Sequence, residues 1–467
     1  MSGIETIKSL LGTGGYIDNA KDMEPYLVGW RGGHAGKAAL VAFPKSTEQV
    51  SKLVALCAEH SIPITPQGGN TGLVGGGVPD TSGKAIVISL SRMNKVRSID
   101  KANYTITVES GFILTQLQEE AAKAGFLFPL SMASEGSANV GGFISTNAGG
   151  TAVLRYGNTR ELVLGIEAVL PDGSVWNALK ALRKDNTGYD LKQLFIGGEG
   201  TLGIVTAATF KLFPKPVQSE TLLLAMKSVE DAVALFAELR KEGGDSLSAF
   251  EIISRTALEL VLKNIPDTRD PFAEKYPYYI LAVFSTSSEL IPLRETTEKL
   301  LEKKLTEGLI PDALLAESVA QAKSFWHVRE HVSEAAKKEG RGVHFDISVP
   351  ISGIPEFIRT VNPEIANAVP EAIILPFGHI GDGNIHYNIC LPKTWDDAKF
   401  ESAKDTMKKS VYAALKRLHG SISAEHGIGV ERREDLKEFK SKEEITMMKA
   451  LKKALDPKGI MNPGKML

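Results

Sequence analysis

Two short segments in the C-terminal half carry the residue types of a metal site. His379 and His386 flank Asp382-Gly383, a pair typical of a two-residue hairpin turn. Counting outward from that turn pairs residue 379 with residue 386, and directly opposed side chains of antiparallel strands lie about 5 Å apart at Cβ. Two imidazoles placed in this way could hold one metal ion, with Glu425 from further along the chain as an oxygen ligand.

This ligand set leaves coordination positions open, which is typical of catalytic metal sites rather than structural ones. Zinc is the first expectation for the ion, although manganese and cobalt accept the same ligands. Asn388 follows His386 by two residues, so on a strand the two side chains point the same way. A surface hairpin that binds no metal is the alternative interpretation of this spacing.

A glycine-rich loop in the N-terminal half, from Pro66 to Pro79, indicates a second binding site. Before it, a Ser46/Gln49 capping pair and apolar residues at helical spacing predict a helix, and residues 62–65 predict a strand. The loop leads into another strand, residues 85–90, rather than a helix, and it has no Walker lysine. Because neither a dinucleotide-binding nor a Walker motif fits, we expect a nest of backbone N–H groups that binds a pyrophosphate, and a purely structural turn is the alternative.

Small residues also dominate several later segments. Such runs let the backbone approach a flat, bulky ligand closely, and glycine costs chain entropy wherever it is used. Residues 162–170 predict a strand, so this half should be a mixed sheet with loops. The small-residue segments are 131–137, 141–150, 155–158, 184–190 and 197–205.

The composition is that of an ordinary globular chain of 467 residues, with 43% hydrophobic and 24% charged residues. A net charge of −2 provides no basic field, so we expect no nucleic-acid partner. Cys57 and Cys390 are expected as buried thiols rather than a disulfide. The start of the chain has no leader pattern and no segment is long and apolar enough for a membrane span, so a cytoplasmic location is expected, with a peripheral membrane role as the alternative.

Taken together, these segments resemble the FAD-binding flavoproteins of the vanillyl-alcohol oxidase and p-cresol methylhydroxylase (PCMH) superfamily. The similarity lies in the branch of D-lactate, glycolate and D-2-hydroxyglutarate dehydrogenases. It covers nearly the whole chain, and its motifs appear in the family's order: the glycine loop, Asn147 to Gly150, residues 184–190, the 379–388 hairpin and residues 423–429.

The resemblance implies which residues hold FAD. The pyrophosphate would be cradled by the glycine loop, and the ring, ribose and adenine by the later small-residue segments, with Asn462 where the C-terminal segment folds back over the flavin. The implied residues are Pro66, Gln67, Gly68, Gly69, Asn70, Thr71, Gly75, Gly76, Ser131, Ser137, Gly141, Gly142, Asn147, Ile204, Val205 and Asn462.

Some relatives attach the flavin covalently through His or Tyr. No histidine lies between His60 and His327, so we expect noncovalent FAD, with a tyrosine link as the alternative.

Flavin beside a metal implies oxidation of a small 2-hydroxy acid, which can chelate the ion through its hydroxyl and carboxylate. His426 is the candidate general base, taking the hydroxyl proton as hydride leaves C2 for flavin N5. The resemblance implies the same roles, with His379, His386 and Glu425 as metal ligands and Asn388 and His426 beside the substrate.

Arg329 is the candidate partner of the substrate carboxylate, with Ser333 one helical turn further on. The alternative is that Arg329 pairs with Glu330 or Glu334 on a solvated helix. Where the 2-hydroxyglutarate dehydrogenases have a lysine, this chain has His344. The acid could therefore be 2-hydroxyglutarate, lactate, malate or a related D-acid.

The expected fold class is α+β. A PCMH-type FAD-binding domain should cover residues 1–214, with a boundary at the prolines near 214–216. An antiparallel-sheet substrate (cap) domain should cover 215–420, and a segment at 421–467 should return to the flavin.

For the electron acceptor, the resemblance implies an electron-transfer flavoprotein, a cytochrome or a quinone, and it makes a homodimer the expectation. A metal-dependent hydrolase and a nonenzymatic flavin electron carrier are the alternative functions.

Overall fold

The helix, strand and glycine-rich loop expected between residues 46 and 79 all occur in the computed structural model, which describes residues 3–30 and 32–467. Ser46 caps α3 (Thr47–Glu59) by accepting a hydrogen bond from the backbone N–H of Gln49. The strand begins later than expected, as β3 (Ile64–Gln67). The reason is that Ile62 still donates to a carbonyl of α3 and Pro63 has no N–H for a ladder.

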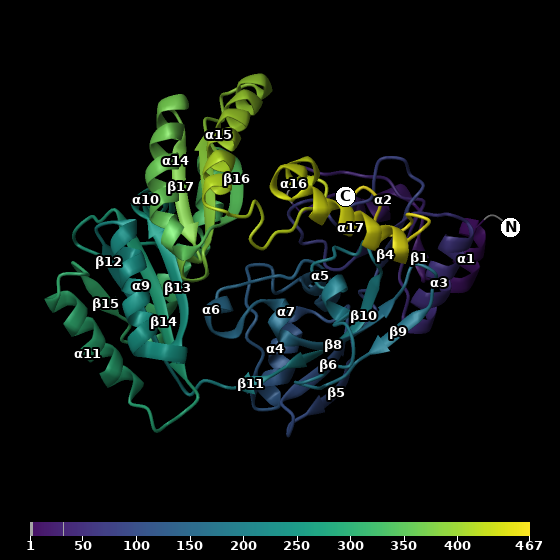
Figure 1. Ribbon diagram of the computed structural model, residues 1–467, viewed down its shortest axis with the longest axis horizontal. Helices are drawn as coiled ribbons and strands as arrows, with labels where there is room; N and C mark the ends of the chain where they lie inside the picture. The colour runs from purple at the N-terminus through teal and green to yellow at the C-terminus, as the bar shows by residue number, and fades with distance from the viewer. Residues whose placement is uncertain (1–2, 31) are drawn as a thin grey trace. The chain divides into compact units, whose positions relative to one another are not determined.

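The chain divides into two compact units, and the first contains the chain up to Gly150, then Gly157–Lys215 and Glu425–Leu467. Its elements are α1 (Gly3–Leu11), β1 (Tyr16–Ile17), α2 (Ala20–Leu27), β2 (Leu40–Ala42), α3, β3, β4 (Ile86–Ser89), β5 (Val96–Asp100), β6 (Thr105–Glu109), α4 (Leu114–Lys123), β7 (Phe126–Leu127), α5 (Val140–Ser145), α7 (Thr159–Leu162), β8 (Val163–Val169), β9 (Val175–Ala178), α8 (Lys192–Phe195), β10 (Ile204–Lys211), β11 (Phe213–Pro214), α16 (Arg433–Phe439) and α17 (Lys442–Leu455) (Figure 1).

Two sheets build this unit. The first has the order β1-β2-β4-β3, with parallel pairing of β4 to both β2 and β3 and antiparallel pairing of β1 to β2. The second, β5-β6-β10-β8-β9, is antiparallel throughout. Near the end of the chain Met461 forms a parallel bridge to Ile64 of β3, and both side chains are buried in one core with α1 and α3.

The second unit contains Thr151–Tyr156 and Pro216–Ala424. Its elements are α6 (Val153–Tyr156), β12 (Gln218–Met226), α9 (Val229–Gly243), η1 (Gly244–Ser246), β13 (Leu247–Ser254), α10 (Arg255–Asn264), β14 (Tyr278–Thr286), α11 (Leu293–Thr306), β15 (Ala313–Leu315), α12 (Val319–Glu330), α13 (Val332–Glu339), β16 (Arg341–Ser348), η2 (Ile351–Gly353), α14 (Ile354–Ala368), β17 (Ile373–Gly378), η3 (Ile380–Asp382), β18 (Asn384–Leu391) and α15 (Asp397–Arg417).

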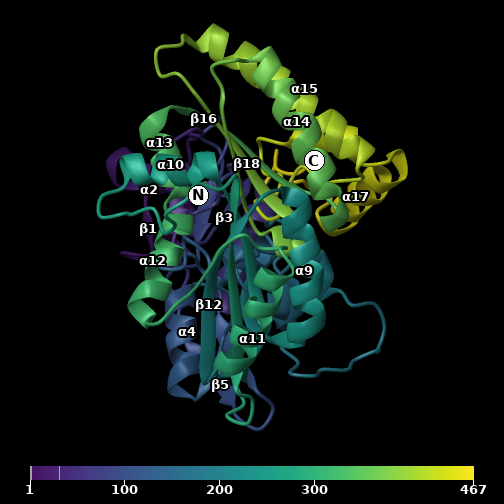
Figure 2. The ribbon, with the colours of Figure 1, turned by 90° about the vertical axis from the view of Figure 1, so that its left-hand side faces the viewer.

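A seven-stranded antiparallel sheet of order β15-β12-β14-β13-β17-β18-β16 forms the centre of the second unit. Helices α10, α12 and α13 cover one face of this sheet, and α9, α11 and α14 lie over the other (Figure 2). The face toward α10, α12 and α13 buries Ile253, Leu375, Phe377 and Cys390. Strands backed by helices confirm the α+β prediction.

Near the C-terminus, the Ser441/Glu444 pair and the apolar residues Ile445, Met448, Leu451 and Leu455 predict a helix that packs by an apolar stripe. Helix α17 has the expected capping box. None of its residues is fully buried: Ile445, Met448 and Leu455 are half-buried and Leu451 is exposed, so the stripe is only partly packed. Cys57 and Cys390 are free, buried thiols, as expected. Within the described residues, no helix is both long and apolar enough to cross a membrane.

Candidate functional site

The two histidines of the expected hairpin lie close together, although in a different register. Strand β17 pairs with β18 so that Phe377, not His379, opposes His386. The turn is wider than two residues because Gly378 has a φ of 124° and the chain then forms η3, which closes at Gly383 with a φ of 90°. This turn still brings the rings of His379 and His386 to a centroid separation of 5.2 Å.

Polar residues of the neighbouring strand β16 share the sheet face that carries His386. Asp346 opposes His386 and His344 opposes Asn388, so all four side chains project from one face. Asp346 is buried, accepts a hydrogen bond from Asn384 Nδ2 and lies 3.6 Å from His386 Nδ1. A buried carboxylate therefore lies beside one of the two histidines.

A second buried carboxylate, Glu251 of β13, lies beside the other histidine. Its Oε1 is 2.6 Å from His379 Nδ1, and its Oε2 accepts a hydrogen bond from Arg329 Nε, also at 2.6 Å. Burial alone would raise the pKa of Glu251, but the charges of His379 and Arg329 and their hydrogen bonds lower it to about 2. Glu251 is therefore an anion that joins the candidate metal ligand to the candidate carboxylate-binding residue.

Arg329 lies near the end of α12 and is buried, so neither Glu330 nor Glu334 is its partner. The guanidinium pairs with Glu251 and lies 5.0 Å from the ring centroid of Phe377, whereas Glu334 pairs with Lys338. The helix does not continue from Arg329 to Ser333, because α12 ends before His331 and α13 begins after it. Ser333 is consequently exposed on α13.

Sequence reasoning missed Glu251 and Asp346, and only for Glu251 was a signal present. Glu251 is a single charge inside the apolar strand Leu247–Ser254, and a charge in such a strand requires a buried partner. Asp346 alternates with the buried apolar residues Val343, Phe345 and Ile347 of β16, a pattern that predicts a solvent-facing side chain, yet Asp346 is buried. The partners of these carboxylates come from a helix, a turn and another strand, and could not be identified from the sequence.

In the first unit, the structure brings the glycine loop together with the predicted flavin residues of other segments. A Cβ at Gly69 would come within 1.8 Å of the Ser137 carbonyl oxygen, so only glycine fits there. Gly68 packs against Gly142 at the start of α5. Gly141 donates its backbone N–H to the carbonyl of Ser110.

The remaining predicted flavin residues are distributed around this loop. Asn462 Nδ2 donates to the carbonyls of Gly76 and Glu199, which joins the C-terminal segment to the glycine loop. Asn147 follows α5 with a φ of 50°. Ile204 and Val205 are the first residues of β10, whereas the hydroxyl of Ser131 donates to Glu135.

The residues of this unit fit a bound FAD. Among the described residues, three buried side-chain oxygens near the loop have no hydrogen-bond partner: Gln67 Oε1, Ser110 Oγ and Asn462 Oδ1. Buried polar atoms are normally satisfied, so these are available to a ligand. Moreover, a Cβ at the half-buried Gly142 would meet no atom within 4 Å, so there is open space beside this backbone.

The segment that contains the candidate base is held by Glu199. The carboxylate of Glu199 accepts hydrogen bonds from the backbone N–H groups of Ile428 and Gly429, both at 2.7 Å. Burial raises the pKa of Glu199, and these two bonds only partly oppose that rise. In the same segment, His426 Nε2 lies 3.9 Å from Glu425 Oε1.

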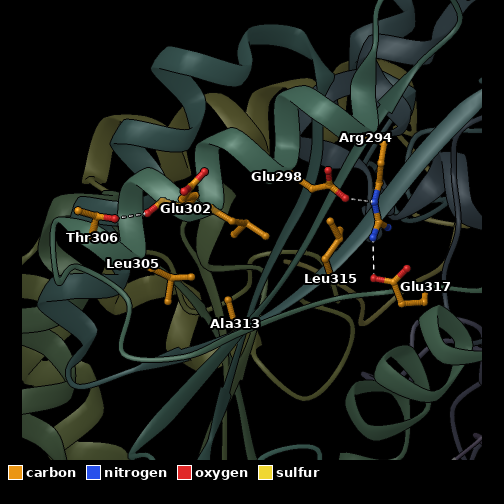
Figure 3. A pocket seen from close by; sticks show the side chains of 9 residues that line it. Arg294, Glu298, Glu302, Leu305, Thr306, Ala313, Leu315 and Glu317 are labelled. Atoms are coloured by element: carbon orange, nitrogen blue, oxygen red, sulfur yellow. Dashed lines mark hydrogen bonds and ion pairs between the residues drawn. The ribbon is translucent and has the colours of Figure 1, made fainter.

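A surface hollow of about 370 Å³ lies elsewhere in the second unit, between α11 and the edge strand β15 (Figure 3). Arg294 lies at one end of it and pairs with Glu298 and Glu317, so charged side chains satisfy one another there. None of its lining residues is a predicted site residue.

Comparison with known proteins agrees with the two-part architecture. Residues 38–178 match the FAD binding domain family, and residues 215–466 match the family of FAD linked oxidases, C-terminal domain. The mitochondrial D-2-hydroxyglutarate dehydrogenase of Arabidopsis thaliana is 37% identical over 464 residues, covering 99% of this chain and 81% of that protein. The D-2-hydroxyglutarate dehydrogenase of Xanthomonas citri pv. viticola is 37% identical over 445 residues, covering 95% and 92%.

Among solved structures, p-cresol methylhydroxylase with substrate bound superposes with a TM-score of 0.76 at 16% identity, covering 99% of this chain and 96% of the other. That similarity shows the fold alone. The family matches and the full-length relatives establish that this chain, which has the fold of p-cresol methylhydroxylase, is an FAD-dependent oxidoreductase belonging to the FAD-linked D-2-hydroxyacid dehydrogenases.

Proposed function

We propose that this enzyme oxidises a D-2-hydroxy acid to the corresponding 2-oxo acid with the assistance of a divalent metal ion. D-2-Hydroxyglutarate is the first candidate substrate, because relatives that match nearly the whole chain carry the name of that activity. D-Lactate and D-malate share the reacting group and are the next candidates.

The observation that carries this proposal is the link from His379 through Glu251 to Arg329. A 2-hydroxy acid presents a chelating hydroxyl and a carboxylate at one end. The two imidazoles supply nitrogen ligands for a cation, and the guanidinium supplies a partner for a carboxylate. The imidazole of His379 and the guanidinium of Arg329 are both held by one buried anion, Glu251 of β13.

His379, His386 and Glu425 are the proposed metal ligands. The backbone N–H of Ala424 donates to the carbonyl of Asp346, and Glu425 is the next residue in the chain. A divalent cation bound there would lower the pKa of the substrate hydroxyl. Asn388, on the same face of β18 as His386, is placed to hydrogen-bond a substrate oxygen.

His426 is the proposed general base for the hydroxyl proton. A base must be held within hydrogen-bond reach of the proton that it takes, and the two hydrogen bonds that Glu199 accepts fix the backbone just after His426. Bound FAD would supply the hydride acceptor. The chain's own residues would then orient the acid and remove one proton.

The remaining partners are also part of the proposal. A second redox protein or a quinone would reoxidise the flavin, and the flavin would be held without a covalent bond. Zinc is the proposed ion, a homodimer the proposed assembly and the cytoplasm the proposed location.

An anaerobic titration with D- and L-2-hydroxy acids tests this function. We expect D-acids to bleach the flavin absorbance near stoichiometrically, and L-acids to have little effect. His426→Asn should retain FAD but lose this bleaching. If no D-2-hydroxy acid reduces the flavin, the proposed activity is wrong, and if the variant is reduced at the normal rate, only the role of His426 is wrong.

A further inference from the structure

Glu251 has an unusual environment for a buried carboxylate, because each of its oxygens contacts a different functional group. Oε1 is 2.6 Å from His379 Nδ1 and Oε2 is 2.6 Å from Arg329 Nε. The relative exposure of Glu251 is 1%, and those of His379 and Arg329 are 7% and 9%. Solvent is therefore excluded from all three groups, which strengthens both interactions.

The contact with Glu251 determines how His379 can bind a cation. A carboxylate accepts a hydrogen bond but cannot donate one, so Nδ1 carries the proton in this contact and His379 would bind a metal through Nε2. A carboxylate in this position also fixes the ring orientation and makes the imidazole a better ligand.

The same carboxylate determines which edge of Arg329 can meet a substrate. Within the described chain, its only side-chain hydrogen bond is the one from Nε to Glu251. A guanidinium that donates through Nε presents its Nη1 and Nη2 edge to a second carboxylate. Phe377 packs against the guanidinium and also lies 5.2 Å from the ring of His386, so the arrangement is rigid.

We infer that Glu251 is a positioning residue that supports metal binding and substrate-carboxylate binding at the same time. The inference rests on the proposed function, because it assigns a supporting role to a residue behind the proposed ligand His379 and the proposed carboxylate partner Arg329. It predicts that one substitution weakens two different ligands, while FAD, which is bound by residues of the other unit, is unaffected.

Three variants of the FAD-loaded enzyme test the inference. Glu251→Gln keeps the shape but removes the charge. Arg329→Met removes the guanidinium and leaves Glu251 beside His379. Glu339→Gln is the control, because Glu339 is a partly buried glutamate that, like Glu251, accepts hydrogen bonds from two side chains, here Lys263 and Asn264, but it contacts no site residue.

Zn²⁺ affinity is measured by chelator competition, FAD content by absorbance and KM with a D-2-hydroxy acid at saturating Zn²⁺. In Glu251→Gln we expect Zn²⁺ affinity to fall about 10- to 100-fold and KM to rise about 10-fold, with unchanged FAD. Excess Zn²⁺ should restore kcat but not KM, which a general loss of folding would not produce. Arg329→Met should raise KM without weakening Zn²⁺, and Glu339→Gln should match the wild type.

If folded Glu251→Gln binds Zn²⁺ as tightly as the wild type, Glu251 does not position His379 and the inference is overturned. If Glu251→Gln cannot be purified, the double variant Glu251→Gln/Arg329→Met, which leaves no unpaired buried arginine, carries the Zn²⁺ test with the same expected loss. A wild-type enzyme that binds no divalent metal but is reduced by D-acids would overturn the metal part of the proposed function, and the inference with it.

Discussion

The carboxylate of Glu199 accepts a hydrogen bond from the backbone N–H of Gly429 at 2.7 Å, across a sequence separation of 230 residues. The other oxygen of Glu199 accepts from Ile428, and Asn462 donates to the Glu199 carbonyl. Glu199 therefore holds both the segment that contains the candidate base His426 and the C-terminal segment that contains Asn462.

Replacing Glu199 by Ala should destabilise the protein and reduce catalysis more than it reduces FAD binding. The buried N–H of Gly429 and the part-buried N–H of Ile428 would lose their acceptor, at a cost of about 1–3 kcal/mol for the buried group and less for the other. Denaturant unfolding should therefore report a loss of at least about 1–3 kcal/mol, and kcat should fall because the segment beside His426 is released. Glu431→Ala, an exposed glutamate of the same segment, is the control and should behave as the wild type.

Glu199 should contribute to the way in which the free energy of unfolding depends on pH. Burial raises its pKa in the folded state, so the folded protein holds this proton more tightly than the unfolded chain, in which the pKa is about 4.3. The stability of the wild type relative to Glu199→Gln should therefore be greatest below about pH 4.3 and decrease as the pH rises above it. Urea unfolding of both proteins from pH 4 to 7 measures this difference, and a difference that grows with pH would contradict the assignment.

Noncovalent FAD is tested by precipitating the protein with acid. We expect the yellow colour to remain in the supernatant, because no histidine that could link to the flavin lies between His60 and His327. A yellow pellet would instead indicate a covalent link, and peptide mapping would then identify the attached tyrosine.

The preference among D-acids should depend on His344. This residue opposes Asn388 on the same sheet face as His386, about one strand repeat away. His344→Lys places a permanent cation there, so kcat/KM should rise about 10-fold for D-2-hydroxyglutarate, which has a second carboxylate. D-Lactate, which lacks that carboxylate, is the matched control substrate, and an equal change for both acids would show that residue 344 does not select between them.

Much of this organisation could be predicted from local sequence signals. The Ser46 and Ser441 caps and the glycine loop are encoded by neighbouring residues, and the structure has them close to where they were expected. The hairpin register could not be predicted. Asp382-Gly383 has the sequence of a two-residue turn, but in the structure Asp382 belongs to η3, and the positive φ of Gly378 widens the turn further.

Long-range pairing is the part that local signals do not specify. Arg329, on helix α12, has two acidic neighbours in sequence, yet its partner is Glu251, 78 residues away on strand β13. The break between α12 and α13 at His331 likewise moves Ser333 away from the buried side of the helix. Both outcomes depend on how the helices pack against the sheet.

Asn462 provides a test of how the C-terminal segment supports the flavin. Its Nδ2 donates to the carbonyls of Gly76 and Glu199, and its backbone has a φ of 43°, which asparagine, aspartate and glycine tolerate better than other residues. Asn462→Asp keeps the backbone preference but directs a carboxylate at two carbonyl oxygens, so it should weaken FAD binding about 10- to 100-fold, or about 1.4–2.7 kcal/mol.

Asn462→Gly removes the side chain but still allows the positive φ of this backbone, so it should weaken FAD binding less than the aspartate variant. Fluorescence titration of the apoprotein with FAD measures all three affinities. If Asn462→Asp binds FAD as tightly as the wild type, then the bridge between the C-terminal segment and the glycine loop does not contribute to holding the cofactor.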